Sequence, residues 1–335
     1  MSKETMRNRA RVALLAAVFA AFSVLIPVFA CSYIKNMKQP DGDRRETKYY
    51  SHSNTVRVYD VSSSKLVEMD LEGYVLGVLA GEMPASYEME ALKAQAVAAR
   101  TFTIEKMENG GCGKASGAQV CTDSTHCQAY CSEQERMKKW GASFDENEKK
   151  LRQAVEATRG EIMLYHDEPI LALFHSSSGG ITEDVENVFS QALPYLRSVK
   201  SEGEENEPRF SSNRIISKDE FKSTVKSRSG SARFEAGNAA AWIGDIVRFP
   251  SGRVKSIIIG GTSFTGREVR GMFELDSTNF DIAFKNGDVI FSTRGYGHGV
   301  GMSQTGADAM AKRGASYREI LMHYYTGIEI AAIEE

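Results

Sequence analysis

The chain has 335 residues, with 41 Lys and Arg against 44 Asp and Glu, so its formal net charge at pH 7 is only −3. This near-neutral balance gives no support for a nucleic-acid partner. With 42% hydrophobic residues, the chain is long enough to bury a core as one large domain or two ordinary ones.

The first 31 residues predict a membrane anchor. Residues 1–11 carry four basic side chains, and an uncharged run extends from Val12 to Cys31. Such a run can cross about 30 Å of hydrocarbon as a helix, and the basic residues favour a cytoplasmic N-terminus. We expect a cytoplasmic tail over 1–11 and a single-pass signal anchor over 12–31, at the cell membrane, with the body outside the cytoplasm. A signal peptide cleaved near Ala30 and a lipoprotein signal ending at Cys31 are the alternatives.

The body of the chain begins after a polar stretch. Residues 32–54 lack periodicity and are expected to form a tether. Alternating residues then predict two strands, over 56–60 and 65–71. A short buried helix is expected over 71–81, and Pro84 fits the first turn of the helical segment that follows it.

The middle of the chain mixes helices with a cysteine-rich loop. Helical spacing extends from Glu90 to Lys106 and ends before two glycines. The loop covers 112–131, and a charged helix with a glycine stop is expected over 146–160. A hairpin over 161–175 is expected to turn at 167–169.

The last third predicts a largely antiparallel sheet. Ser217 and Glu220 form a capping pattern before a helix, as do Ser316 and Glu319. A strand over 253–261 and a helix near 267–275 follow the first of these helices, and Asn286-Gly287 predicts a hairpin. Because regular βαβ alternation is missing, we expect one α+β domain over 55–335 with hairpin-paired strands.

Glu82 is the first candidate for chemistry. Its flanks, Leu79–Gly81 and Met83–Pro84, are small or apolar. A carboxyl in such surroundings resists ionisation, which suits a general acid. A helix start or a nearby arginine would lower its pKa, so burial has to dominate. The alternative is a carboxylate that only stabilises a helix start.

Arg100 is the second candidate. It lies in the predicted helix from Glu90 to Lys106, among the apolar residues Ala98, Ala99 and Phe102. An arginine in an apolar face needs an anionic or multiply accepting partner. It is therefore either a group of the active site or half of a buried structural ion pair.

The cysteine loop predicts a metal site. Thiolate and imidazole ligands suit zinc, and we expect Cys121, His126 and Cys127 to bind it. Few acidic ligands accompany them, so the zinc is expected to be structural rather than hydrolytic. Because Cys112 and Cys131 lie nearby and the body is expected to be exported, disulfides are the alternative, followed by free thiols.

Two loops are rich in glycine. Residues 174–184 combine hydroxyl groups with glycines, and such a loop can bind a sugar. Residues 294–307 have a glycine at every second position from 295 to 301 and present His298 and Gln304, which we expect to bind substrate. The alternative is a tight loop that packs on the core and caps the helix from Ser303.

Four separated segments together resemble the family of stage II sporulation protein D and the amidase enhancers. The resemblance covers nearly all of 55–330. It is carried by residues 71–102, 120–130, 175–189 with 194–199, and 295–307 with 320–330.

The resemblance implies a lytic transglycosylase of peptidoglycan that acts during engulfment in sporulation. Glu82 falls on the family's catalytic acid and Arg100 on its arginine. The residues implied to line the glycan groove are Gln128, Tyr130, Ser177, Gly180 and His298. The implied partners are glycan strands, an amidase (stage II protein P) and a polytopic membrane protein (stage II protein M).

The chemistry agrees with a single acid. Glycosidases that use water usually need two carboxyls. A lytic transglycosylase lets the 6-hydroxyl of muramic acid attack C1, so one group can donate a proton and later accept one. The alternative function is a non-catalytic glycan-binding scaffold that enhances a partner amidase.

Overall fold

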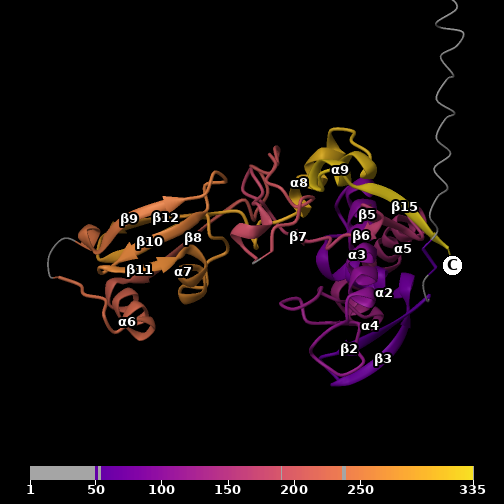
Figure 1. Cartoon of the computed structure of the whole chain (residues 1–335), viewed down its shortest axis with the longest axis horizontal. Coiled ribbons are helices and arrows are strands. Elements are labelled where there is room, and N and C mark those ends of the chain that lie inside the picture. The colour runs from indigo at the N-terminus through magenta and orange to yellow at the C-terminus, as the bar shows by residue number, and fades with distance from the viewer. Residues whose placement is uncertain (1–49, 52–53, 190, 236–238, 335) are drawn as a thin grey trace, which may run out of the picture. The chain divides into compact units, whose positions relative to one another are not determined.

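A computed structural model describes residues 50–51, 54–189, 191–235 and 239–334, which belong to one compact unit (Figure 1). The expected cytoplasmic tail, the expected anchor and nearly all of the expected tether lie outside the described residues. Within these ranges, no helix combines the length and the apolar character that crossing a membrane requires.

Helices and strands alternate irregularly along the described chain. The helices are α2 (Leu71–Glu82), α3 (Met89–Glu108), α4 (Glu133–Trp140), α5 (Phe144–Glu156), α6 (Lys218–Arg228), α7 (Gly266–Met272), α8 (Gln304–Lys312) and α9 (Tyr317–Tyr324). The strands are β1 (Tyr50–Ser51), β2 (Thr55–Asp60), β3 (Lys65–Asp70), β4 (Val120–Cys121), β5 (Glu161–Tyr165), β6 (Glu168–Pro169), β7 (Phe174–His175), β8 (Ser211–Ser217), β9 (Ile243–Arg248), β10 (Val254–Ile259), β11 (Thr262–Thr265), β12 (Phe280–Lys285), β13 (Asp288–Arg294), β14 (Met302–Ser303) and β15 (Glu329–Glu334). The expected α+β class is confirmed. Most described strand pairs are antiparallel, and β1–β15, β2–β4 and β7–β14 are parallel.

The first apolar core surrounds α3. This helix contacts α2, α5, α8, α9 and β5, which Figure 1 shows gathered around it. Its side chains are buried from Ala91 to Ile104 with the exception of Lys93. A helix that is buried on all sides is a central helix, and its many alanines let the neighbouring helices approach closely.

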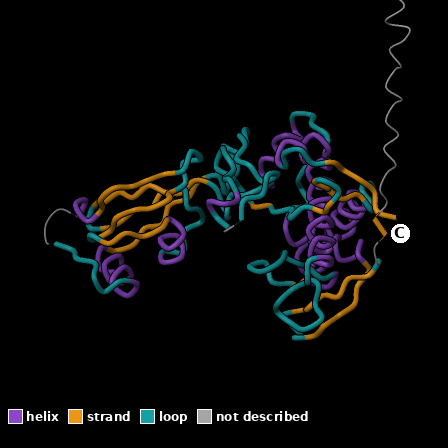
Figure 2. The backbone as a smooth tube through the Cα atoms, viewed as in Figure 1, coloured by secondary structure: helices purple, strands orange, loops and turns teal. Residues whose placement is uncertain are grey.

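A second apolar core lies in an insertion between Phe210 and Gly295. The insertion forms two three-stranded sheets, β12–β13–β8 and β11–β10–β9, with α6 and α7 beside them (Figure 2). Phe221 is fully buried there and stacks on Phe273 with ring centroids 5.2 Å apart. The chain enters and leaves at one point, because the Gly295 N–H donates to the Phe210 carbonyl at 2.7 Å.

Several local predictions are confirmed. β2 and β3 pair as a hairpin, and α3 covers the expected helix. Asn286 and Gly287 both have positive φ, 54° and 95°, and join β12 to β13. Ser217 and Ser316 cap α6 and α9 as expected.

Four local expectations were wrong or incomplete. Pro84 lies in the turn between α2 and α3 rather than in the first turn of a helix. The hairpin turns at His166-Asp167, where both φ values are positive, so Glu168 and Pro169 already belong to β6. The charged helix α5 ends at Glu156, four residues before the glycine at 160. Helix α4 was missed, although Ser132 and Glu135 form a complete capping box before it.

Candidate active site and metal centre

Glu82 is the last residue of α2 and not a residue at a helix start. Met83 has an extended backbone, with φ −119° and ψ 146°, and stops the helix. The C-terminal end of a helix carries partial negative charge and disfavours another anion. Burial acts in the same direction and raises the pKa of Glu82, against hydrogen bonds from Ala129 and Gln304 that lower it. The expected conflict between a helix start and burial is therefore absent, and the carboxyl keeps its proton to a higher pH than an ordinary glutamate.

The Glu82 carboxyl lines an open cleft of about 460 Å³. The Ala129 N–H donates to its Oε1 at 2.6 Å, and Gln304 Nε2 donates to its Oε2 at 3.3 Å. Gln304 Nε2 also lies 3.4 Å from Gln95 Oε1, in α3. The short bond engages Oε1, so Oε2 is the oxygen left to carry a proton. Of the residues expected to bind substrate, Gln304 is thus brought directly to Glu82.

Two glycines of α2 let the segment after the cysteine loop lie against the helix. A Cβ atom at Gly77 would lie 2.1 Å from the Tyr130 ring, and one at Gly81 would lie 2.8 Å from the Ala129 carbonyl oxygen. Neither position has space for a side chain. This close approach is what places the Ala129 N–H at Glu82.

Gln128 and Tyr130 flank that backbone donor, but neither is among the residues that line the cleft. Gln128 is buried, and its Nε2 donates to Thr103 Oγ1 at 3.3 Å. The half-buried Tyr130 stacks on Tyr74 with ring centroids 5.6 Å apart and an interplanar angle of 9°. Both residues support the segment that carries the donor, and their contact with a substrate stays a prediction.

Arg100 is fully buried and binds Glu72, in α2, rather than Glu82. Its Nε and Nη2 donate to the two carboxylate oxygens of Glu72 at 2.8 and 2.6 Å, and its Nη1 donates to the Glu161 carbonyl at 3.0 Å. Glu72 Oε1 also accepts the Gly160 N–H at 3.2 Å. Arg100 does not line the cleft. The expectation that it faces the glutamate's groove is corrected, and the geometry matches the alternative of a structural ion pair.

Ser177 faces a buried carboxylate. Its hydroxyl donates to Glu204 Oε2 at 2.7 Å, and the Ser178 hydroxyl donates to Oε1 at 2.7 Å. These hydroxyl donors lower the pKa of Glu204 although burial raises it. Gly180, with φ 106°, accepts the Ser201 N–H, and neither it nor Ser177 lines the cleft. Ser176 is the serine of this loop that does.

His298 also lies apart from the residues that line the cleft. Its Nδ1 accepts the Val300 N–H at 3.0 Å, and its ring packs near His175 with centroids 5.5 Å apart. Burial lowers the pKa of His298 to about 4, so the ring is neutral at pH 7. It lines a different hollow, together with Phe189 and Arg270.

The cleft also contains polar residues that the sequence analysis missed. They are Ser86, Tyr87, Lys139, Glu207, Arg209 and Thr305. Lys139 comes from the overlooked helix α4, for which the capping box was the available signal. Glu207 and Arg209 come from an irregular segment that gives no periodic pattern.

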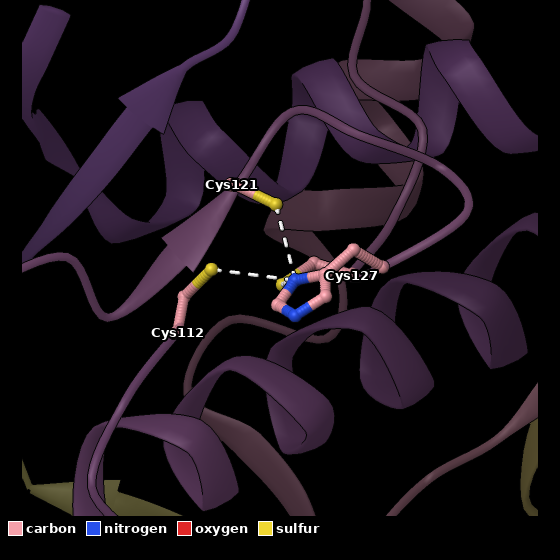
Figure 3. A group of neighbouring side chains, drawn as sticks. Cys112, Cys121 and Cys127 are labelled. Carbon is pink, nitrogen blue, oxygen red and sulfur yellow. Dashed lines mark hydrogen bonds between the residues drawn. The ribbon is translucent and has the colours of Figure 1, made fainter. Parts of the chain in front are cut away.

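The cysteine loop gathers four ligands rather than the three expected. Cys112, Cys121, His126 and Cys127 each offer one atom, and all four atoms lie within 4.8 Å of one another. Figure 3 shows the three cysteines converging. His126 Nδ1 lies 3.4 Å from the Cys112 and Cys127 sulfurs and 3.5 Å from that of Cys121. Tetrahedral zinc with three thiolates and one imidazole requires about 3.6 Å for that spacing. The donor set therefore fits a metal, and Cys112 was the ligand missed.

The four cysteines that the structure describes are all free thiols. Burial raises the pKa of Cys121 and Cys127, so both favour the neutral thiol when no metal compensates. Cys131 lies outside the ligand group and packs in the first core. Its backbone N–H donates to the Gly77 carbonyl at 2.9 Å, so the loop is joined directly to α2.

Comparison with known proteins identifies the family. A family model described as stage II sporulation protein matches residues 59–165. Stage II sporulation protein D of Bacillus amyloliquefaciens is 37% identical over 278 residues, which cover 83% of this chain and 78% of that protein. The chain belongs to the stage II sporulation protein D family.

Two further relatives of this stage II sporulation protein D family member support the same assignment. The protein of that name from Bacillus subtilis (strain 168) is 37% identical over 279 residues, covering 83% of this chain and 79% of the relative. An amidase enhancer of the same strain is 30% identical over 306 residues, covering 76% of this chain and 40% of the enhancer. Membership links the protein to sporulation. The matched range 59–165 contains Glu82, its Ala129 donor and the cysteine cluster.

Proposed function

We propose that this protein is a lytic transglycosylase that cleaves peptidoglycan glycan strands. The supporting observation is the Glu82 carboxyl, which lines an open cleft, has a raised pKa and is oriented by two hydrogen-bond donors. A carboxyl with these properties keeps its proton to a higher pH than an ordinary glutamate, which suits a general acid.

In the proposed reaction, Glu82 Oε2–H donates its proton to the glycosidic oxygen, and the bond from that oxygen to C1 of muramic acid breaks. The 6-hydroxyl oxygen of the same sugar then bonds to C1, and its proton passes to the Glu82 carboxylate. One product ends in 1,6-anhydro-muramic acid, and the other ends in a free 4-hydroxyl. The Ala129 N–H holds Oε1 throughout, so the reacting oxygen keeps its position.

The decisive experiment is Glu82→Gln tested on purified glycan strands. The amide is similar in size but carries no transferable proton, so cleavage is expected to fall by at least about 10²-fold while strand binding persists. Glu88→Gln is the matched control, because Glu88 is exposed and does not line the cleft. Mass spectrometry of the wild-type products should show anhydro ends.

Two results would contradict the proposal. New reducing ends would show that water attacks. Glu207, which also lines the cleft, would then be the first residue to test as the second carboxylate. Strand binding without any new ends would favour the second candidate, a non-catalytic scaffold for an amidase. That candidate rests on the relative named amidase enhancer.

We also propose that the cysteine cluster holds one structural zinc through Cys112, Cys121, His126 and Cys127. Four protein ligands leave no open position for water, which is typical of structural sites. When bound, the metal would fix the loop that ends at the Ala129 donor. The cluster would therefore support the position of Glu82 without taking part in the reaction.

The proposed location is the outer face of the cell membrane, with residues 12–31 as a single-pass anchor. The basic residues before that run support this orientation. The proposed partners during engulfment are the stage II P amidase and the stage II M membrane protein, in line with the amidase-related name of one relative. Fractionation of cells would test the anchor, since a cleaved signal would release a shortened soluble protein.

A further inference from the structure

A buried amide, that of Gln95, lies behind the Glu82 site. Gln95 belongs to the middle of α3, where it is fully buried among side chains that are mainly apolar. Its Oε1 accepts from Gln304 Nε2 at 3.4 Å, and the same Nε2 donates to Glu82 Oε2 at 3.3 Å. Glu82 is the last residue of α2 and Gln304 is the first residue of α8. Three helices therefore contribute one side chain each to a row, which we name the amide row.

One atom at the inner end of the amide row has no partner. Gln95 Nε2 is buried and makes no hydrogen bond among the described residues. A buried N–H without an acceptor is unfavourable, so this amide calls for an explanation. At the outer end, Gln304 lines the cleft, and its Oε1 accepts no hydrogen bond from any described residue. The row therefore has a free donor inside and a free acceptor at the cleft.

The hydrogen bonds of the row can also run in the opposite direction. Rotation of a glutamine amide by about 180° exchanges its oxygen and its nitrogen, and this terminal torsion is broad and roughly two-fold. If both amides rotate, Gln95 Nε2 donates to Gln304 Oε1 and gains its acceptor. The place without a partner then falls to Gln95 Oε1, and an unsatisfied carbonyl is better tolerated than an unsatisfied N–H.

This reversed direction requires a protonated Glu82. After the rotation, Gln304 Oε1 faces Glu82 Oε2 across the spacing that Nε2 spans in the structure. Two oxygen atoms attract at such a distance only if a hydrogen lies between them, and a carboxyl supplies one when it is protonated. A carboxylate fits the direction that the structure has, and an acid fits the reversed one.

We propose that Gln95 and Gln304 form a reversible amide pair whose hydrogen-bond direction follows the protonation state of Glu82. With the carboxylate, Gln304 Nε2 donates to Glu82 Oε2, as in the structure. With the acid, Glu82 Oε2–H donates to Gln304 Oε1, which also accepts from Gln95 Nε2. No covalent bond forms or breaks, because only the two amides rotate. Gln95 is thus a positioning residue that acts through Gln304.

Such a pair suits a residue that is an acid in one step and a base in the next. This inference rests on the proposed function, in which Glu82 loses a proton to the glycosidic oxygen and regains one from the 6-hydroxyl. Before the strand enters, the pair accepts the Oε2–H and stabilises the acid. Once the proton has left, the rotated amide donates to Oε2 and stabilises the carboxylate. A fixed donor would stabilise only the carboxylate, and a fixed acceptor would stabilise only the acid.

Charged neighbours contribute equally to all the proteins that the test compares. The other titratable side chains that line the cleft are Tyr87, Lys139, Glu207 and Arg209. None of them forms a hydrogen bond with Glu82 in the described chain. On α8, Asp308 pairs with Lys312 at 2.7 Å. On α3, Arg100 pairs with Glu72. Because the variants leave all these groups in place, a difference in the titration of Glu82 reports on the amides.

The test measures the titration of Glu82 directly, by infrared difference spectroscopy of the full chain in detergent. The carboxyl band that Glu82→Gln lacks belongs to Glu82, so its pKa is obtained without any substrate. Gln95→Met keeps the volume of the side chain and removes both amide groups, and Gln95→Leu replaces it if methionine disturbs folding. Thr101→Val is the matched control, because it removes another fully buried polar group of α3, one that accepts the Met163 N–H at 2.9 Å.

We expect Gln95→Met to lower the pKa of Glu82 by about 0.5–1 pH unit and Thr101→Val to leave it unchanged. The pKa falls because only the direction that goes with the acid satisfies the buried N–H of Gln95, and the variant removes this preference. In a Gln304→Met background, Gln95→Met should have no effect on this pKa, because Gln95 acts through Gln304. The high-pH limb of the kcat profile for strand cleavage should move down with the pKa.

Three results would overturn the proposal. A pKa of Glu82 that rises in Gln95→Met would show that Gln95 only holds Gln304 in one direction, as a donor. An unchanged pKa with a lower melting temperature would show a merely structural amide. A shift that persists in the Gln304→Met background would show that Gln95 does not act through Gln304.

The outcome can be separated from that of the proposed function, because the infrared titration needs no cleavage. If Glu82→Gln still cuts strands, the proposed acid is wrong, and the titration still decides whether the amide pair exists. If the wild type releases anhydro ends but its Glu82 titration does not respond to Gln95→Met, the amide pair is wrong and the proposed function stands.

Discussion

Arg100→Met is the variant that best separates a structural role from a catalytic one. The native guanidinium makes two bonds to Glu72 and one to the Glu161 carbonyl, all in a fully buried site. Methionine fills similar space but leaves the Glu72 carboxylate, itself only 8% exposed, without its counter-ion. Removing one partner of a buried pair typically costs about 3–5 kcal/mol.

That cost converts to a measurable shift in melting temperature. The compact unit Tyr49–Glu335 should unfold with an entropy of about 0.6 kcal/mol/K, from the average per residue. The expected loss is therefore about 5–8 °C. Arg214→Met breaks an exposed pair with Glu274 at 3.6 Å, and it should cost no more than about 1 kcal/mol.

The assay combines thermal unfolding with strand cleavage by the folded protein. We expect Arg100→Met to lose stability while its folded fraction retains cleavage. Adding Glu72→Gln should restore part of the loss, because a neutral amide removes the unpaired charge and still accepts the Gly160 N–H. A variant that melts like the wild type but no longer cleaves would refute this reasoning and return Arg100 to the active site.

Two further predictions follow from Glu82 and the cysteine cluster. The pKa of Glu82 is raised in the folded protein, so the native state keeps a proton that the unfolded chain releases above pH 4.5. The free energy of unfolding of the wild type is therefore expected to fall as the pH rises from 4.5 through the raised pKa. Measured by urea unfolding, Glu82→Gln should become more stable relative to the wild type as the pH rises through this range. If the difference in the free energy of unfolding between the two proteins does not change with pH, burial does not raise the pKa of Glu82. Elemental analysis should find about one zinc per chain, lost with a fall in melting temperature in Cys112→Ser but retained in Cys131→Ser, because only Cys112 belongs to the ligand group. Zinc that is unaffected by Cys112→Ser would exclude the four-ligand site.

Sequence reasoning succeeded where the signal is local. The positive φ values at Asn286 and Gly287 and the caps at Ser217 and Ser316 depend on neighbouring residues, and the structure confirms them. Glu82 was selected from its apolar flanks, and its raised pKa agrees with that choice.

The partners of the functional residues could not be predicted in the same way. Arg100 lies on an apolar helix face, so an anionic partner was expected. Nothing in the neighbouring sequence indicates that this partner is Glu72, which lies 28 residues earlier in another helix. Cys112 joins the ligand group through a turn within the loop, in which its backbone N–H donates to the Ala118 carbonyl at 2.9 Å, and the spacing of the cysteines does not reveal that turn. Ser176 and Ser177 are adjacent and chemically identical, and contacts distant in sequence, to Glu204 and to the Tyr296 backbone, determine that Ser177 faces inward.

The two ends of the insertion lie side by side, which separates its length from the position of the Glu82 cleft. The chain departs after Phe210 and returns at Gly295 beside it, so the intervening residues can change in length without moving the ends that join the first core. All residues that line the Glu82 cleft lie outside this stretch. A change in the length of the insertion is therefore expected to leave the acid and its donors in place.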